Sequence, residues 1–207
     1  MKTFLFQGDS ITDANRNRDH RTHLGCGYAM LTGSQLMYDY PGELRCLNLG
    51  VSGDRITDVY ARIKEDIINL KPDYMTFLIG FNDVSHELTM QCGLSTEKFE
   101  MIYCMMIDEI KAALPEIKII ILEPFVLKGP STERLWEAFD REVKKNAAAA
   151  KRVAEKYGLP FVALQDKFDA ACKLVDTTWW SGDGVHPSFA GHQLITNELL
   201  PVIRSLL

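Results

Sequence analysis

Residues 3–10 read Thr3-Phe4-Leu5-Phe6-Gln7-Gly8-Asp9-Ser10, a short apolar run that a glycine closes and two polar residues follow. A run of this length between turn signals is typical of a buried strand. Four similar runs follow along the chain, at Leu44–Leu49, Tyr74–Ile79, Lys118–Leu122 and Phe161–Leu164. The sequence therefore predicts five strands.

Helical patterns lie between these runs. Apolar side chains recur every three or four residues over 56–67, which predicts one amphipathic helix before Pro72. Further helices are expected at Ser95–Leu114, with Ser95 as N-cap, at Glu133–Tyr157 and at Ser188–Leu206. Strands that alternate with helices predict a parallel sheet covered on both faces, a three-layer α/β/α sandwich. In such folds ligands bind beyond the carboxyl ends of the strands.

Bulk properties narrow the class of protein. The 207 residues suit a single domain, 1–207, and a net charge of -5 argues against a nucleic-acid partner. No apolar stretch approaches the roughly 18 residues that span a bilayer, so no membrane association is expected. The amino-terminal residues do not resemble a signal peptide, which predicts a cytoplasmic protein. The five cysteines form no C-x-x-C pair and are expected to be reduced thiols.

Polar residues gather where the first three strands end. Ser10 follows the first strand and could be a helix cap or a nucleophile beside a helix N-terminus. Gly53 follows the second strand. It either forms a simple turn before a helix or, because it has no Cβ, presents a backbone N–H that a substrate can approach. Asn82 follows the third strand, as a cap or as an amide donor to an oxyanion.

A fourth segment, Asp183-Gly184-Val185-His186-Pro187, places a carboxylate three residues before an imidazole. That spacing allows Asp183 to accept from one ring nitrogen of His186 while the other nitrogen faces a serine hydroxyl. The four segments together supply the parts of one acyl-transfer site.

These segments resemble the SGNH, or GDSL, hydrolase family, in the family's order along the chain. Gly8-Asp9-Ser10 matches the block of the nucleophile, Gly53 and Asn82 match the oxyanion residues, and Asp183 with His186 matches the block of the remaining triad members. The resemblance implies a flavodoxin-like sheet of order 2-1-3-4-5 and neither a metal nor an organic cofactor. It implies a catalytic triad of Ser10, Asp183 and His186, with the N–H of Ser10 completing the oxyanion hole.

The chain looks most like the acetyl xylan esterase branch of that family. The continuation Asn82-Asp83-Val84 and the stretch His186-Pro187-Ser188, followed by Ala190-Gly191-His192, carry this likeness. The small Ser85 departs from the bulky aromatic expected near it. The resemblance implies a serine esterase for short-chain acetyl esters of carbohydrates such as acetylated xylo-oligosaccharides. The family's acetyl esterases can assemble into larger rings, so the resemblance also allows a homo-oligomer.

Two other functions stay open at this point. One is a lysophospholipase-like or thioesterase-like lipid esterase of the same family, and the other is an inactive carbohydrate-binding protein on the same fold. A short chain leaves little room for a large apolar lid, which favours a short acyl group. Fluorophosphonate labelling of Ser10 would separate an enzyme from a binding module.

Several further residues are candidates for contact with substrate. Trp179 and Trp180 precede the Asp183 turn and could stack on a sugar or pack the loop. Asp9 either supports the Ser10 turn or touches the ligand, and His86 could line the rim of the pocket. Other residues are not expected to act at the site. Ser52 is a poor match to a nucleophile elbow, and the loop of His20 and His23 is too cationic for a metal. His192 is expected to be structural.

Overall fold

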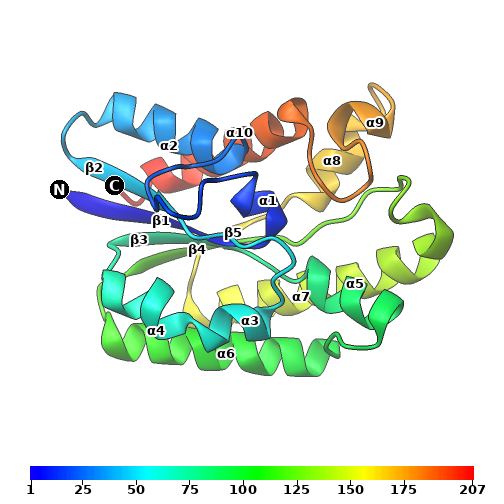
Figure 1. The fold of residues 1–207 in the computed structure, drawn as a ribbon, viewed down its shortest axis with the longest axis horizontal. Coiled ribbons are helices and arrows are strands. Elements are labelled where there is room, and N and C mark those ends of the chain that lie inside the picture. The colour runs from blue at the N-terminus through cyan, green and yellow to red at the C-terminus, as the bar shows by residue number, and fades with distance from the viewer.

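Five parallel strands lie between two layers of helices in the computed structural model, which describes residues 1–207 (Figure 1). The strand order is β2-β1-β3-β4-β5, so the predicted parallel sheet and its order are confirmed. The strands are β1 (Lys2–Gly8), β2 (Leu44–Asn48), β3 (Tyr74–Leu78), β4 (Lys118–Leu122) and β5 (Phe161–Val162).

Each face of the sheet carries its own layer of helices (Figure 1). One layer contains α2 (Tyr28–Asp39), α8 (Gln165–Ala171), α9 (Thr177–Trp180) and α10 (Phe189–Arg204). The other contains α3 (Ile56–Ala61), α4 (Ile63–Asp66), η1 (Ile68–Leu70), α5 (Phe81–Met90), α6 (Thr96–Ala113), η2 (Glu133–Leu135) and α7 (Trp136–Tyr157). The short α1 (Ser10–Asp13) follows β1 at the carboxyl edge of the sheet. This arrangement confirms the three-layer α/β/α sandwich.

Alternation along the strands sends side chains into both layers. Phe4 and Phe6 of β1 enter the core beneath α2 and α10, whereas Leu5 enters the core beneath α6 and α7. All three side chains are fully buried. Burying such a side chain contributes about 1.5–3 kcal/mol each, so the sheet is anchored on both faces.

The single helix predicted over 56–67 is wrong, because the chain breaks at Arg62 between α3 and α4, and again at Ile67 before η1. Arg62 leaves the helical region, with φ -108° and ψ 10°, and its guanidinium pairs with the carboxylates of Asp54 and Asp66. The apolar side chains of Ile56 and Ile67 still reach the same core. The hydrophobic pattern therefore reported the buried face correctly but not the continuity of the backbone.

The fifth strand is shorter than predicted. β5 ends at Val162, because the carboxylate of Glu123 accepts hydrogen bonds from the N–H groups of Leu164 (2.6 Å) and Gln165 (2.8 Å). The carboxylate replaces a strand partner and turns the chain into α8. No helix of the protein is both long and apolar enough to cross a membrane.

The end of β1 packs too closely against β3 to accept a side chain at Gly8. A Cβ there would lie 2.3 Å from the carbonyl oxygen of Leu78 and 2.4 Å from the hydroxyl of Thr12. Gly8→Ala should therefore lower the free energy of unfolding by about 2–3 kcal/mol, because the backbone must move. Chemical denaturation measures this. Gly182→Ala is the control, since its Cβ would meet nothing within 4 Å; equal losses in both variants would contradict the packing argument.

Candidate active site

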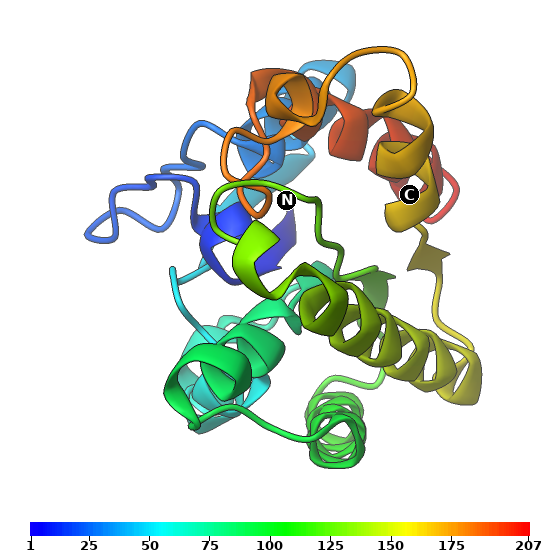
Figure 2. The ribbon, with the colours of Figure 1, turned by 90° about the vertical axis from the view of Figure 1, so that its right-hand side faces the viewer.

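Ser10 is the first residue of α1 and lies directly beyond the carboxyl end of β1. The carboxylate of Asp9 caps this short helix by accepting from the N–H of Ile11 at 3.0 Å. The helix ends at Ala14, in the left-handed region with φ 41° and ψ 52°. The result is a tight turn that presents Ser10 at the edge of the sheet, where α1 lies at the centre of Figure 2.

The segment before α10 brings an imidazole and a carboxylate to Ser10. The Nε2 of His186 lies 2.9 Å from the hydroxyl oxygen of Ser10, and its Nδ1 lies 2.6 Å from a carboxylate oxygen of Asp183. A carboxylate can only accept, so the ring proton sits on Nδ1 and Nε2 accepts from the serine hydroxyl. The three side chains predicted as a triad thus form one hydrogen-bonded chain.

Hydrogen bonds hold Asp183 in its ionised form. Its second oxygen accepts from the N–H groups of Val185 and His186, each at 2.8 Å. Burial alone would raise the pKa of Asp183, but the bonds from the His186 ring and from these two N–H groups outweigh it and lower the pKa. The carboxylate stays charged and fixes the orientation of the ring.

Asn82 is bonded to the loop that carries Gly53, across the ends of β2 and β3. The side-chain amide of Asn82 donates to the carbonyl of Asp54 at 3.1 Å, which pins the amide beside Gly53. One N–H of that amide is used in this bond, and the second is available to a ligand. Gly53 is exposed, with φ +88°, and its N–H donates to no group of the protein. These groups are therefore free to donate to an oxyanion.

The loop that carries Gly53 is bonded to the turn that carries Ser10. The N–H of Val51 donates to the carbonyl of Gly8 at 3.1 Å. The carboxylate of Asp13 accepts from both the N–H and the hydroxyl of Ser52, at 3.0 and 3.1 Å. The serine hydroxyl set aside as a rival nucleophile therefore binds a carboxylate, whereas the hydroxyl of Ser10 binds an imidazole.

Two buried carboxyl groups, Asp9 and Asp83, lie beneath the site. Burial raises the pKa of Asp9 to about 7, against the opposing bond from the N–H of Ile11. Burial also raises the pKa of Asp83 to about 7, and the nearby charge of Asp9 adds to the rise. Asp9 caps the Ser10 turn and does not line the cavity beside Ser10 and His186.

A cavity of about 510 Å³ opens beside Ser10 and His186. Some of its lining residues, among them Phe189 and His192, had no predicted role at the site. His192 was expected to be structural; it is buried but also reaches this cavity. The lining residues are Ser10, Ile11, Ala14, Asn15, Cys26, Ser52, His186, Pro187, Ser188, Phe189 and His192.

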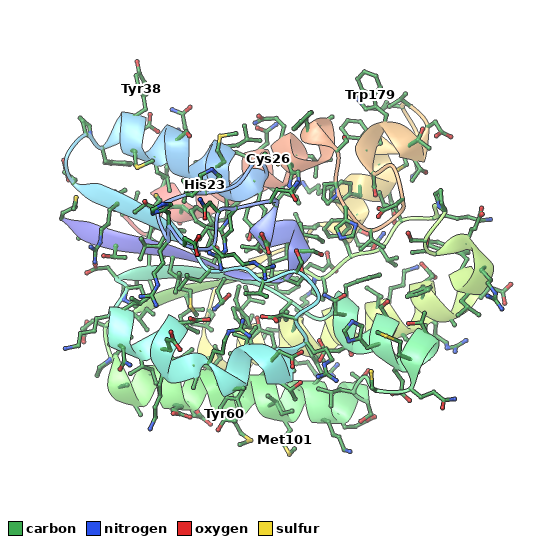
Figure 3. The ribbon with its side chains drawn as sticks, in the orientation of Figure 1. His23, Cys26, Tyr38, Tyr60, Met101 and Trp179 are labelled. Carbon is green, nitrogen blue, oxygen red and sulfur yellow. The ribbon has the colours of Figure 1, made fainter.

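Other predicted contact residues lie outside the cavity lining. Trp179 is 61% exposed and projects from the outer side of α9 (Figure 3). Trp180 packs against the core, and its carbonyl accepts from the N–H of Ser188 at 2.8 Å. His86 is half-buried on α5 and does not line the cavity either. Their stacking or rim contacts stay predictions.

The histidines of the exposed loop after α1 are engaged by the loop itself. The Nδ1 of His23 accepts from the N–H groups of Asn17 (3.0 Å) and Gly25 (3.3 Å). The backbone of His20 forms turn bonds with Asn17 and His23. No cluster of three or more His, Cys, Asp or Glu side chains is arranged to hold a metal ion.

A family model described as the GDSL-like lipase/acylhydrolase family matches residues 6–194. The chain belongs to this family. GDSL-type enzymes cleave carboxylic esters, and the chain is a carboxylic ester hydrolase.

Relatives of this GDSL hydrolase cover nearly its full length. An acetylxylan esterase from Geobacillus stearothermophilus is 33% identical over 95% of this chain and 91% of its own. A crystal structure of that organism's Axe2, also an acetylxylan esterase, has a TM-score of 0.86 at 30% identity, covering 97% and 93% of the chains. A crystal structure from Parabacteroides merdae, described in its name as a GDSL-like lipase, has a TM-score of 0.92 at 33% identity, covering 97% and 94%.

The raised pKa of Asp9 makes a prediction for the stability of this GDSL hydrolase. A carboxyl that keeps its proton in the folded protein stabilises it fully below about pH 4, and this contribution is lost as the pH rises through 7. Asp9→Asn keeps an oxygen for the N–H of Ile11 but cannot ionise. Between pH 5 and pH 8 the wild type should lose about 2–3 kcal/mol of unfolding free energy that the variant keeps. Denaturant titrations at both pH values measure the difference, and parallel pH dependences would contradict it.

Proposed function

We propose that this chain is a serine esterase that removes acetyl groups from carbohydrates such as acetylated xylo-oligosaccharides. The hydrogen-bonded chain from Asp183 through His186 to Ser10, with distances of 2.6 and 2.9 Å, is the observation that carries the proposal. That arrangement activates a serine hydroxyl for attack on an ester carbonyl. The acetylxylan esterases among its relatives support the choice of substrate class.

In the first half of the proposed reaction, the Ser10 oxygen bonds to the carbonyl carbon while His186 takes the hydroxyl proton on Nε2. The negative charge of Asp183 stabilises the imidazolium that forms. The tetrahedral intermediate then collapses: the bond from carbon to the leaving oxygen breaks, and His186 returns its proton to that oxygen. The alcohol departs and an acetyl-enzyme remains.

The oxyanion of the intermediate lies in a set of three N–H donors. Ser10 supplies its backbone N–H, one of the free donors at the start of α1, and Gly53 supplies another. Asn82 supplies the second N–H of its amide, because the first holds the carbonyl of Asp54. Each such donor is worth about 3–4 kcal/mol of barrier in acyl transfer. Water then attacks the acetyl-enzyme, His186 acts again as base and acid, and acetate leaves.

The cavity argues for a large alcohol and a small acyl group. His186 must reach the leaving oxygen to protonate it, so the alcohol lies on the His186 side of the reacting carbon. The cavity of about 510 Å³ is lined by His186, Pro187 and Phe189, whereas the proposed oxyanion donors Gly53 and Asn82 do not line it. The space beside Ser10 therefore suits a bulky alcohol such as a sugar. Trp179 does not line the cavity, so its stacking stays a proposal only for the part of a longer oligosaccharide that extends beyond it.

Removal of the nucleophile tests the mechanism. Ser10→Ala should lose at least about 1,000-fold in kcat and all labelling by a fluorophosphonate, with unchanged unfolding midpoint. Ser52→Ala is the matched control: it removes a hydroxyl that lines the same cavity but binds Asp13, and its labelling should persist. A folded Ser10→Ala protein that still turns over ester, or labelling lost in Ser52→Ala alone, would sink the assignment of Ser10.

A comparison of substrates tests the ester class. Acetate release from acetylated xylo-oligosaccharides should exceed fatty-acid release from a lysophospholipid, because His186, which protonates the leaving alcohol in the proposed reaction, lines the cavity. In a series of nitrophenyl esters, kcat/KM should fall steadily from acetyl to chains beyond about eight carbons. Turnover of the lysophospholipid without turnover of the sugar ester would favour the lipid esterase instead.

A further inference from the structure

His192 is a buried polar side chain that the proposed reaction leaves unused. It lies on α10 and is only 7% exposed. Its Nδ1 accepts from the backbone N–H of Tyr28 at 3.1 Å. Burial lowers the pKa of His192 to about 4, with a smaller contribution from His186, so the ring is neutral near pH 7. A neutral ring that accepts on Nδ1 carries its proton on Nε2.

No group of the protein accepts from this Nε2–H, and the ring lines the cavity beside Ser10. Most other polar side chains of the cavity already have partners. Ser10 and His186 bind each other, and Ser52 donates to Asp13. Ser188 donates to the carbonyl of Trp179 at 2.5 Å. His192 therefore provides a buried donor that only a molecule in the cavity can use.

The ring is held rigidly in this orientation. It stacks on Tyr28, with centroids 6.4 Å apart and planes at 24°. A Cβ at Gly27 would lie 2.7 Å from its Cε1, so the backbone passes directly beside the ring. Tyr28 in turn shares a hydrogen bond of 2.9 Å with Thr12 of α1, the helix that begins at Ser10. The donor is thus fixed relative to the nucleophile before any substrate binds, which reduces the entropy lost on binding.

We propose that the Nε2–H of His192 donates a hydrogen bond to a hydroxyl oxygen of the leaving alcohol, and so selects acetyl esters of polyols and sugars over those of simple alcohols. The inference rests on the proposed function. The acetyl group offers no acceptor except its carbonyl oxygen, which the oxyanion donors take. Phe189, 79% exposed where it lines the cavity, adds an apolar surface of the kind that the face of a sugar ring covers.

His192→Asn is the test variant, because its side-chain oxygen can replace Nδ1 as acceptor for Tyr28 while the Nε2–H donor is lost. On a monoacetylated methyl xyloside its kcat/KM should fall about 3–10-fold, the range of one neutral hydrogen bond. On 4-nitrophenyl acetate, whose leaving group carries no hydroxyl, it should stay within about twofold of the wild type. His192→Gln, which returns a donor near the position of Nε2, should restore most of the loss on the sugar ester.

Substrate analogues give a second test that needs no variant. Among acetylated methyl xylosides that each lack one hydroxyl, at least one should lose about 3–10-fold in kcat/KM with the wild type. His192→Asn should not distinguish that analogue from its parent, because the partner of the missing hydroxyl is already gone.

The outcomes separate this inference from the proposed function. A wild type that cleaves 4-nitrophenyl acetate but no acetylated xyloside overturns the carbohydrate proposal and this inference with it. A wild type that cleaves both overturns the inference alone if His192→Asn weakens both substrates equally or neither. Equal kcat/KM of the wild type for all the deoxy analogues would also overturn the inference alone.

Discussion

The active-site geometry depends on buried polar side chains that bind two neighbouring strand ends together. Asn48 is fully buried at the end of β2. Its side-chain amide donates to the carbonyls of Thr12 (2.7 Å) and Leu24 (2.9 Å). Its side-chain oxygen accepts from the N–H of Gly50 at 3.0 Å. Asp13 accepts from Ser52 in the opposite direction. A buried polar group that loses its hydrogen-bond partner lowers the stability of the folded protein. The loop after β2 cannot separate from α1 without breaking several such bonds. These bonds therefore hold the loop of Gly53 and the turn of Ser10 in one fixed arrangement.

The same edge of the sheet contains carboxyl groups that a stable core would avoid. Asp9 and Asp83 are almost completely buried, and burial raises the pKa of each to about 7. Each still accepts from one backbone N–H, of Ile11 and Ile56, and so fixes the start of a helix. Near neutral pH the folded protein must either protonate these groups or tolerate their charge. Stability is thus lost in order to hold the backbone around Ser10 and Asn82 in one conformation.

The sequence predicted the features that depend on local pattern. Five apolar runs gave the strands, and the glycine and polar residues after them marked the residues that converge at the carboxyl edge. It did not predict α2, because the buried face of that helix contains Thr32 and Gly33, which give no apolar periodicity. It also missed the break at Arg62, which depends on carboxylates that folding brings together, one of them in the preceding loop.

The role we assign to His192 could not be read from its position in the sequence. A histidine on an amphipathic helix has the pattern of a core residue, and by burial His192 is one. Two features of the folded chain change that interpretation. The N–H of Tyr28 binds Nδ1 and so fixes the ring proton on Nε2, and the ring lines the cavity beside Ser10. The role depends on hydrogen-bond partners that lie far apart in the sequence and meet only in the folded chain.

The segment from Asp183 to His192 joins the chemistry to the choice of substrate. Asp183 and His186 lie in a turn whose backbone bonds fix the imidazole, and Ser188 then caps α10 by accepting from the N–H of Gly191 at 3.2 Å. The cap sets where the first turn of α10 lies relative to the base, and that turn carries both Phe189 and His192 into the lining of the cavity. The base His186 precedes Ser188 in the chain, whereas Phe189 and His192 of the cavity lining follow it. Substitutions after Ser188 can therefore change which alcohol binds while the hydrogen bonds from Asp183 to Ser10 stay intact.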